Sequence, residues 1–317
     1  MTVQLFILLA GIGLLWLGAD VLVKYASRLA RALGVSAIVI GLSIVSMGTS
    51  LPEFVVSLIA ALQKNTGIAM GNIVGSNIAN IGLVLGVGAF ITPLKVKASW
   101  VRREVPFMIG VTLVFYLFSA SGKFLVFWEG VVLVVLMLLF LFYLLKYSRE
   151  DLTELEIAEA PLPEKITSGR KVKYFLLSLV GMALLVAGSK LTVGAGVTIA
   201  KMLRVSDVVI GLTMVAVGTS LPELATTIVG VLHGETDIVV GNVIGSNIFN
   251  LLFIGGVIPL VHPIPVTGGM LLVQFPILVL LSSLLVPIMK VGLSVGRWES
   301  LLLLLIYAAF IFLTIRF

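Results

Sequence analysis

Long apolar runs, separated by short polar stretches, follow one another along almost the whole chain. Most of them reach or exceed the ~20 residues that an α-helix needs to cross ~30 Å of hydrocarbon. Backbone groups in a bilayer need partners inside the same segment, which favours helices over other structures. We therefore predict an all-α membrane protein with ten transmembrane helices, at residues 3–22, 36–62, 68–92, 104–120, 125–146, 173–200, 206–232, 238–262, 269–289 and 298–315.

One stretch between the apolar runs is rich in charged residues. Residues 148–172 hold six Asp or Glu residues, several basic residues and two prolines. Such runs of mixed charge are usually solvated, which makes a regulatory ion site here the less favoured alternative. We therefore predict a charged linker at 148–172 between two membrane domains, residues 1–147 and residues 173–317.

The two predicted domains share two polar motifs at an offset of 170 residues. Residues 48–53 and 218–223 both read Gly-Thr-Ser-Leu-Pro-Glu. Residues 71–80 and 241–250 both follow the pattern Gly-Asn-x-x-Gly-Ser-Asn-Ile-x-Asn. Both motifs lie inside apolar runs, where a polar sequence is unexpected unless it has a specific role.

The repeat extends well beyond these motifs. Between residues 36–94 and 206–264, 25 of 59 positions are identical without a gap. Convergence on a hydrophobic composition does not produce such identity, so we infer an internal duplication of five spans each. Because five is an odd number, the second half enters the membrane in the opposite sense, which gives two inverted five-helix repeats.

Composition and charge agree with a chain that crosses a membrane many times. The 317 residues are 60% hydrophobic and 11% charged, and the mean hydropathy is +1.21. The net charge of +6 needs no nucleic-acid partner, because ten spans place 15 Lys and Arg residues on one side of the membrane and 5 on the other. The positive-inside rule then predicts a cytoplasmic linker and outside termini, in the plasma membrane.

Several classes of chemistry are excluded or disfavoured. Since the chain has no cysteine, it has no disulfide, thiolate metal site or Cys nucleophile. Two histidines are too few for a His-rich transition-metal site, and a membrane hydrolase would need a nucleophile–base pair or a metal cluster. We therefore predict a protein that is not an enzyme and has no cofactor.

Two acidic residues stand apart from the others. Most of the 15 Asp and Glu residues fall in loops or at the ends of spans, whereas Glu53 and Glu223 lie well inside apolar runs. A charge at the centre of a membrane helix costs ~2.5–3.5 kcal/mol on insertion scales, so an intramembrane acid indicates function. The alternative is a protonated or salt-bridged Glu that locks helices together.

The surroundings of both acids are rich in oxygen atoms. The hydroxyls of Thr49, Ser50, Thr219 and Ser220 stand next to them. Pro52 and Pro222 each remove a helix hydrogen bond, which frees carbonyls around 46–48 and 216–218 to face an ion. Carboxylate, hydroxyl and carbonyl oxygens without a soft ligand suit hard cations such as Ca²⁺ and Na⁺. Ordinary helix packing also explains the more distant Ser43 and Ser57.

The second motif adds amide and hydroxyl oxygens to glycines that allow close helix packing. A purely structural glycine motif does not explain the six asparagines that it repeats in an apolar context: Asn72, Asn77, Asn80, Asn242, Asn247 and Asn250. Two ionised glutamates carry a charge of −2, which one Ca²⁺ or two monovalent ions neutralise. Competition between these two states would give cation exchange.

These residues are closely similar to those of the calcium/cation antiporter superfamily, especially its sodium/calcium exchanger branch and prokaryotic members. The resemblance covers the full length, and the doubled pair of motifs is highly specific. It implies ten helices in two inverted five-helix repeats, with spans two, three, seven and eight around the ions. Spans one and six would be long tilted helices that slide to give alternating access.

The family's cation site, carried over position by position, implies a set of ligands in this chain. They are the motif acids, the neighbouring hydroxyls, the backbone oxygens two positions before each motif glycine, and the serines and closing amides of the second motif: Glu53, Glu223, Thr49, Ser50, Thr219, Ser220, Ser46, Ala216, Ser76, Ser246, Asn80 and Asn250. Some relatives, including the potassium-dependent branch, have Asp at the position of Asn250, so Asn argues against potassium cotransport. Proton/calcium exchangers usually carry Ala-x-Glu-His in place of Ser-Leu-Pro-Glu, which favours sodium.

The sequence thus predicts a secondary antiporter that exchanges Na⁺ for Ca²⁺ by alternating access, with Glu53 and Glu223 as the central ligands. The alternative in the same class is H⁺/Ca²⁺ exchange. A cation channel also uses acids and carbonyls, but it is more often built from symmetric subunits around a shared pore. The expected partners are inorganic cations and the lipid bilayer, and we expect the monomer to be the functional unit.

Overall fold

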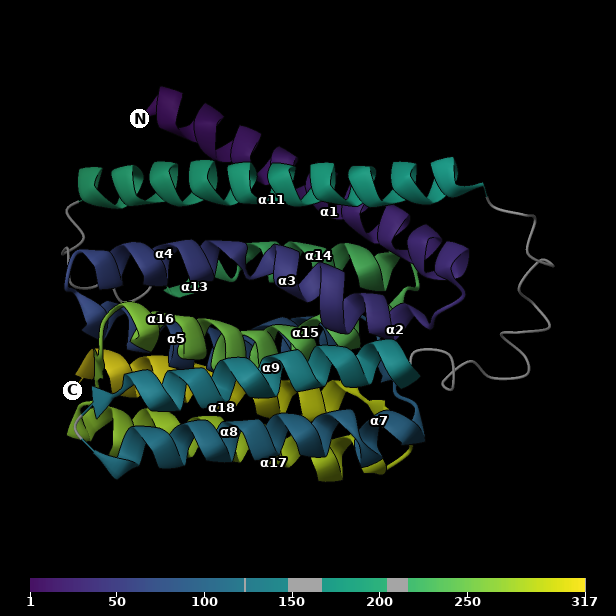
Figure 1. Cartoon of the computed structure of the whole chain (residues 1–317). Coiled ribbons are helices and arrows are strands. Elements are labelled where there is room, and N and C mark those ends of the chain that lie inside the picture. The colour runs from purple at the N-terminus through teal and green to yellow at the C-terminus, as the bar shows by residue number, and fades with distance from the viewer. Residues whose placement is uncertain (123, 148–166, 204–215, 317) are drawn as a thin grey trace.

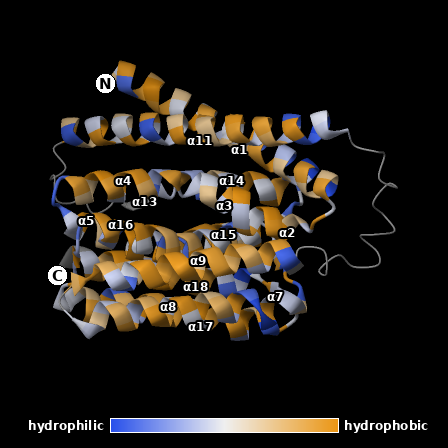
Figure 2. Ribbon diagram, viewed as in Figure 1, coloured by the Kyte–Doolittle hydropathy of each residue, from blue (hydrophilic) through white to orange (hydrophobic). Residues whose placement is uncertain are grey.

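The computed structural model describes residues 1–122, 124–147, 167–203 and 216–316. In this part of the chain, eight helices are long and apolar enough to cross a membrane, and a bent pair of shorter helices makes a ninth. Hydrophobic residues cover most of each helix (Figure 2). The predicted all-α membrane architecture is confirmed. The ten-span count is not, because residues 206–215 of the predicted seventh span lie outside the described residues.

The elements of the first half follow the predicted runs closely. They are α1 (Thr2–Leu33), α2 (Ala37–Ile40), η1 (Gly41–Val45), α3 (Ser46–Thr49), α4 (Leu51–Leu62), α5 (Thr66–Ala79), η2 (Asn80–Leu85), α6 (Gly86–Ile91), β1 (Leu94–Lys95), α7 (Ala98–Arg102), α8 (Glu104–Ser121), β2 (Phe124–Leu125) and α9 (Phe127–Tyr147). The η segments are π-helical turns within longer helices.

The second half repeats this order. Its elements are α11 (Ser168–Met202), α13 (Ala216–Thr219), α14 (Leu221–Leu232), α15 (Thr236–Phe249), η4 (Asn250–Ile254), α16 (Gly255–Val261), β3 (Ile264–Pro265), η5 (Met270–Gln274), α17 (Phe275–Lys290), β4 (Ser294–Val295) and α18 (Arg297–Arg316).

Two helices are longer than the apolar pattern predicts. Helix α1 continues to Leu33 and ends at Gly34, whose φ of 68° is the left-handed conformation of a glycine cap. Helix α11 begins at Ser168, so the last five residues of the predicted linker 148–172 are helical. The apolar pattern misses these turns because polar residues continue a helix beyond the hydrocarbon. Residues 148–166 of the linker lie outside the described residues.

The helices form layers, with α1 and α11 together on one side of the molecule (Figure 1). Next to them lie α3, α4, α13 and α14, and then α5 and α15, while α8 and α17 lie on the far side. Most residues of the spans α5–α6 and α15–α16 are buried, whereas most residues of the other long helices are at least partly exposed. The polar second motif therefore faces protein and not lipid.

Two short antiparallel sheets join the halves of the chain. Strand β1 pairs with β4, with Leu94 opposite Val295, and β2 pairs with β3, with Leu125 opposite Ile264. Each pair therefore takes one strand from either half. An offset of 170 residues converts the first pair into the second.

Helices α1 and α11 pack with their backbones in close contact. A Cβ atom built on Gly181 would lie 2.7 Å from the backbone nitrogen of Leu22 and 2.9 Å from the carbonyl oxygen of Gly18. One built on Gly188 would lie 2.9 Å from the carbonyl oxygen of Gly11. Small residues at such crossings allow helices in a membrane to approach closely.

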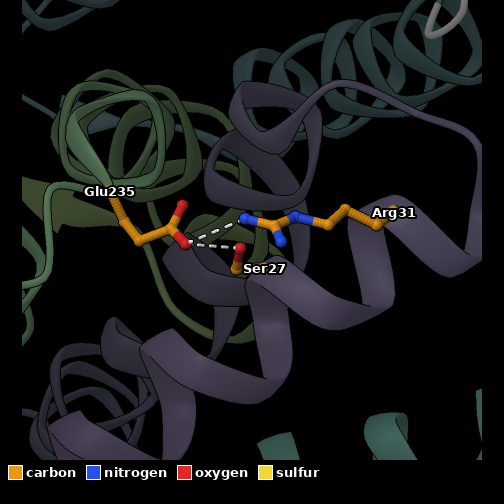
Figure 3. Close-up of polar contacts among 3 residues, drawn as sticks. All are labelled: Ser27, Arg31 and Glu235. Carbon is orange, nitrogen blue, oxygen red and sulfur yellow. Dashed lines mark hydrogen bonds and ion pairs between the residues drawn. The ribbon is translucent and has the colours of Figure 1, made fainter. Parts of the chain in front are cut away.

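Helix α1 also contacts the turn between α14 and α15. The hydroxyl of Ser27 donates to Oε1 of Glu235 over 2.6 Å, and Nη2 of Arg31 lies 3.6 Å from the same oxygen (Figure 3). Two residues before Glu235, Nε2 of His233 lies 3.4 Å from Oδ1 of Asp20 on α1. These contacts join the first helix to the second half of the chain.

We expect the buried contact of Ser27 with Glu235 to contribute more to the free energy of unfolding than the exposed contact of Arg31 with Glu235. Ser27 is 4% exposed, so Ser27→Ala should cost about 1 kcal/mol by removing a hydrogen bond to a carboxylate. The Arg31 side chain is 74% exposed, so Arg31→Ala should cost about 0.5 kcal/mol or less. Thermal unfolding of both purified variants in detergent measures the order, and a larger drop for Arg31→Ala would contradict it.

Candidate cation site

Both Gly-Thr-Ser-Leu-Pro-Glu motifs form a break between two helices. Helices α3 and α13 end at the motif threonine, and α4 and α14 begin at the leucine. The serines between them, Ser50 and Ser220, share nearly the same conformation, with φ of −85° in both and ψ of 7° and 6°. The chain bends by 43° at the first break. Pro52 and Pro222 occupy the start of the new helix, where a missing N–H is tolerated.

This break places each acid in the first turn of a helix. Glu53 lies in the first turn of α4 and Glu223 in the first turn of α14. The N-terminal end of a helix carries a partial positive charge, which stabilises a carboxylate there. The same local geometry therefore presents one acid from each half of the chain.

The two carboxylates are fully buried and incompletely bonded. Glu53 and Glu223 are both 0% exposed. The hydroxyl of Ser50 donates to Oε1 of Glu223 over 3.1 Å, which connects the two motifs directly. Among the described residues, neither oxygen of Glu53 has a hydrogen-bond partner, nor has Oε2 of Glu223. Buried carboxylate oxygens without a donor are costly, and they suit the binding of a cation.

The motif threonines form hydrogen bonds with asparagines of the opposite half. The hydroxyl of Thr49 donates to Oδ1 of Asn242 over 3.1 Å, and the hydroxyl of Thr219 donates to Oδ1 of Asn72 over 3.3 Å. The Thr49 hydroxyl also lies 3.5 Å from Oγ of Ser246. The predicted hydroxyl ligands Thr49 and Ser246 therefore lie next to each other.

The second motif supplies a further set of buried contacts. Nδ2 of Asn72 donates to the backbone oxygen of Glu53 over 3.0 Å and to Oγ of Ser57 over 2.9 Å. Nδ2 of Asn250 donates to Oγ of Ser76 over 3.1 Å, so these two predicted ligands meet across the halves. Asn80 is fully buried, and neither of its amide atoms has a partner among the described residues.

Asn80 and Asn250 share a backbone feature that the sequence does not reveal. Each is the first residue of a π-helical segment, η2 and η4 respectively. Such segments are rare, and they occur frequently at functional sites. Both closing amides of the predicted site are therefore presented from the same irregular backbone.

The prediction about free carbonyls is partly wrong. The backbone oxygen of Ser46 accepts the N–H of Ser50 over 3.0 Å. The carbonyl of Gly218, which Pro222 releases, accepts the hydroxyl of Ser189 on α11 over 2.7 Å. Helix continuation and a neighbouring hydroxyl thus satisfy both groups. A carbonyl keeps a second lone pair, so a ligand role for the oxygens of Ser46 and Ala216 stays a prediction.

For two of the predicted ligands, Ala216 and Ser220, the structure gives no side-chain hydrogen bond among the described residues. Ala216 is the first residue of α13, and its side chain lies outside the described part of the molecule. Ser220 is buried, and its hydroxyl has no partner among the described residues. The structure also adds Asn72 and Asn242, which the implied ligand set omits. Their repetition in the second motif was the available signal.

The donor set favours a hard cation. Among the described residues, no three His, Cys, Asp or Glu side chains come together. The groups around the helix breaks are two carboxylates with neutral hydroxyl, amide and carbonyl oxygens, which suit Ca²⁺ or Na⁺. Ionised, the two carboxylates would carry the charge that one Ca²⁺ or two monovalent ions neutralise.

Comparison with known proteins identifies the family. The family model described as sodium/calcium exchanger protein matches residues 3–146 and 173–316, which hold both helix breaks. The chain belongs to the sodium/calcium exchanger family. It is therefore an integral membrane transporter that exchanges Ca²⁺ for another cation, and not an enzyme.

Individual relatives agree with this assignment. The exchanger is 34% identical to the sodium/calcium exchanger MaX1 of Methanosarcina acetivorans, with 98% of each chain covered. It is 39% identical to the inner membrane protein YrbG of Escherichia coli, over 81% of this chain and 79% of YrbG. Its fold is similar to that of the sodium–calcium exchanger NCX_Mj soaked with 10 mM Na⁺ and no Ca²⁺, with a TM-score of 0.84, 32% identity and 98% of each chain covered.

Proposed function

We propose that this exchanger moves Ca²⁺ in one direction and Na⁺ in the other through one shared site between Glu53 and Glu223. The observation that carries the proposal is the burial of both acids at matching helix breaks, with three carboxylate oxygens that lack a donor in the described structure. Two buried negative charges need cations nearby, and either one divalent ion or two monovalent ions meet that need. Occupancy by one kind of ion then excludes the other.

The proposed ligands are those that the family resemblance implies. They are Glu53, Glu223, Thr49, Ser50, Thr219, Ser220, Ser76, Ser246, Asn80 and Asn250 through their side chains, and Ser46 and Ala216 through their backbone oxygens. The direct contact of Ser50 with Glu223 supports a site shared by both halves. The contact of Asn250 with Ser76 supports the same view.

The proposed architecture is ten spans in two inverted five-helix repeats, with residues 206–232 as the seventh span. Three observations support it. The strand pairs β1–β4 and β2–β3 exchange under the 170-residue offset. The glycine contact of Gly18 with Gly181 exchanges with that of Gly188 with Gly11. The start of α1 and the end of α18 lie on the same side of the molecule, as an even number of spans requires (Figure 1).

Alternating access follows from this architecture. The two halves present equivalent faces to opposite sides of the membrane, so the site opens to one side at a time. The distribution of Lys and Arg supports a cytoplasmic 148–172 segment and outside termini in the plasma membrane. Since both acids come from one chain, a monomer holds a complete site.

The second candidate is H⁺/Ca²⁺ exchange at the same acids. The motif Ser-Leu-Pro-Glu, in place of Ala-x-Glu-His, favours sodium over protons. Asn at position 250 leaves two acids and argues against a potassium requirement.

The counter-ion is tested with purified protein in sealed liposomes. Liposomes loaded with Na⁺ and diluted into Na⁺-free buffer should take up Ca²⁺, and liposomes loaded with choline should not. An acidic interior without Na⁺ provides the proton gradient as the comparison, with the membrane potential clamped. Uptake driven by the pH gradient alone would replace Na⁺ by H⁺, and flux that needs no counter-ion would indicate a channel.

A further inference from the structure

We propose that Asn72 and Asn242 are positioning residues for the cation site: each accepts a hydrogen bond from the hydroxyl of a motif threonine, so that the lone pairs of the threonine oxygen face the ion. The inference rests on the proposed function of this site. The pairs are Thr49 with Asn242 and Thr219 with Asn72, and all four side chains are buried.

The chemistry of a hydroxyl explains why its orientation matters. A threonine hydroxyl has one proton and two lone pairs, whereas an amide oxygen only accepts hydrogen bonds. Among the three hydrogen-bond contacts of the Thr49 hydroxyl, Oδ1 of Asn242 is the nearest at 3.1 Å, against 3.4 Å for the Ser46 carbonyl and 3.5 Å for Oγ of Ser246. A proton directed at Asn242 points away from an incoming cation and leaves the oxygen ready to bind it.

Ser50 illustrates the opposite case. Its hydroxyl donates to the carboxylate of Glu223, the group that an incoming cation must approach. That hydroxyl has to rotate before its oxygen faces an ion. The two asparagines spare the threonines this reorientation, so the threonine oxygens are preorganised ligands.

Hydrogen bonding fixes which end of Asn72 faces Thr219. Nδ2 of Asn72 lies 3.0 Å from the backbone carbonyl of Glu53, and that carbonyl only accepts. The nitrogen must therefore face Glu53, which leaves Oδ1 for Thr219. Nδ2 of Asn242 has no partner among the described residues, so Asn242 acts chiefly through Thr49 and is the cleaner position to test.

The pairing also connects ligand orientation to the packing of the two halves. Thr49 ends α3 in the first half, and Asn242 lies on α15 in the second. Thr219 ends α13 in the second half, and Asn72 lies on α5 in the first. Each threonine is oriented only while its helix packs against the opposite half, so a complete site requires both halves in place.

A double-mutant cycle on Ca²⁺ binding tests this inference. The variants are Thr49→Val, which keeps the shape and removes the hydroxyl, Asn242→Leu, and the two combined. Loss of a group that orients a metal ligand typically costs 10–100-fold in affinity, so each single variant should weaken Ca²⁺ binding by about tenfold. If Asn242 acts through the Thr49 hydroxyl, the double variant should bind about as weakly as Thr49→Val alone.

Titration calorimetry of the purified protein with Ca²⁺, without Na⁺, provides the affinities. The matched control is Asn247→Leu on the same helix, whose amide nitrogen contacts the sulfur of Met108 and, among the described residues, no threonine. When Asn247→Leu is combined with Thr49→Val, the fold loss of Ca²⁺ affinity should be the product of the two single losses. The inference would be overturned if the fold loss of Ca²⁺ affinity in the double variant equalled the product of the losses in Asn242→Leu and Thr49→Val. Unchanged Ca²⁺ binding in Asn242→Leu would also overturn it.

Two further measurements keep the test decisive. If Asn242→Leu does not fold, Asn242→Ala completes the same cycle, and Thr219→Val with Asn72→Ala repeats it in the other pair. The proposed cation site fails separately if the wild type does not bind Ca²⁺ or if Glu223→Gln binds as the wild type does. Because the cycle contains no Na⁺, its outcome does not depend on whether Na⁺ or H⁺ is the counter-ion.

Discussion

Glu53→Gln is expected to reduce Na⁺-dependent Ca²⁺ uptake at least ~100-fold, and Glu223→Gln should do the same. Each change removes one of the two charges at the proposed site while keeping the size and shape of the side chain. A site with one carboxylate no longer neutralises a divalent ion, and a buried uncompensated positive charge is strongly unfavourable. Uptake into proteoliposomes loaded with Na⁺ measures the loss.

The matched control for these variants is Glu235→Gln. Glu235 lies in the same half of the chain as Glu223. Its carboxylate contacts α1 and lies outside the helix breaks. Its variant should retain most of the uptake. Normal exchange in either Glu53→Gln or Glu223→Gln would contradict the assignment of the shared site.

Folding of these variants is checked independently of transport. Saturating Ca²⁺ stabilises a protein that binds it only in the folded state, and this raises the midpoint of thermal unfolding. The wild type and Glu235→Gln should show this rise in detergent, whereas Glu53→Gln and Glu223→Gln should not. Without cations, Glu53→Gln and Glu223→Gln should unfold at temperatures no lower than that of the wild type, because glutamine removes the cost of a buried carboxylate without a partner.

The second large effect is expected at the crossing of α1 and α11. In Gly181→Ala, the new methyl group would lie 2.7 Å from the backbone nitrogen of Leu22, and in Gly18→Ala it would lie 2.7 Å from that of Leu185. Because both obstacles are backbone atoms, the helices must move apart. Such overpacking costs about 1–3 kcal/mol at each position.

Each half of the crossing offers its own control. Gly13 on α1 and Gly194 on α11 have no atom within 4 Å of an added Cβ. Alanine there should be neutral or slightly stabilising, because alanine favours the helix more than glycine does. The midpoint of thermal unfolding, followed by the loss of monodisperse protein in detergent, compares the four variants. Equal midpoints for Gly181→Ala and Gly194→Ala would show that the close contact contributes little.

The candidate site was predictable from the sequence where a single residue type indicates it. Glu53 and Glu223 were identified because an acid inside an apolar run is costly and therefore rare. The helix break beside each acid was also predictable, because a proline such as Pro52 or Pro222 interrupts a helix when it lies in the helix interior. The structure adds that the acids occupy the first turn of the new helices, where the helix dipole favours them.

The prediction of a free carbonyl at Gly218 failed for a tertiary reason. The sequence indicates that Pro222 frees the carbonyl of Gly218, but it does not indicate that Ser189 on another helix takes this carbonyl. In the first half, the position equivalent to Ser189 is Ala19, which has no hydroxyl. The two breaks thus share their backbone conformation and differ in their neighbours.

The sequence by itself determined the helical membrane class, the duplication and the two central acids, because apolar run length, repetition and an isolated charge are local properties of the chain. Only the tertiary structure decided that Thr49 pairs with Asn242, that Thr219 pairs with Asn72, and that Ser50 reaches Glu223. These partners lie far apart in the sequence. The acceptors around a hydroxyl also lie at distances from it that differ by only a few tenths of an ångström. Helix packing sets such distances, and no periodicity along the chain encodes them.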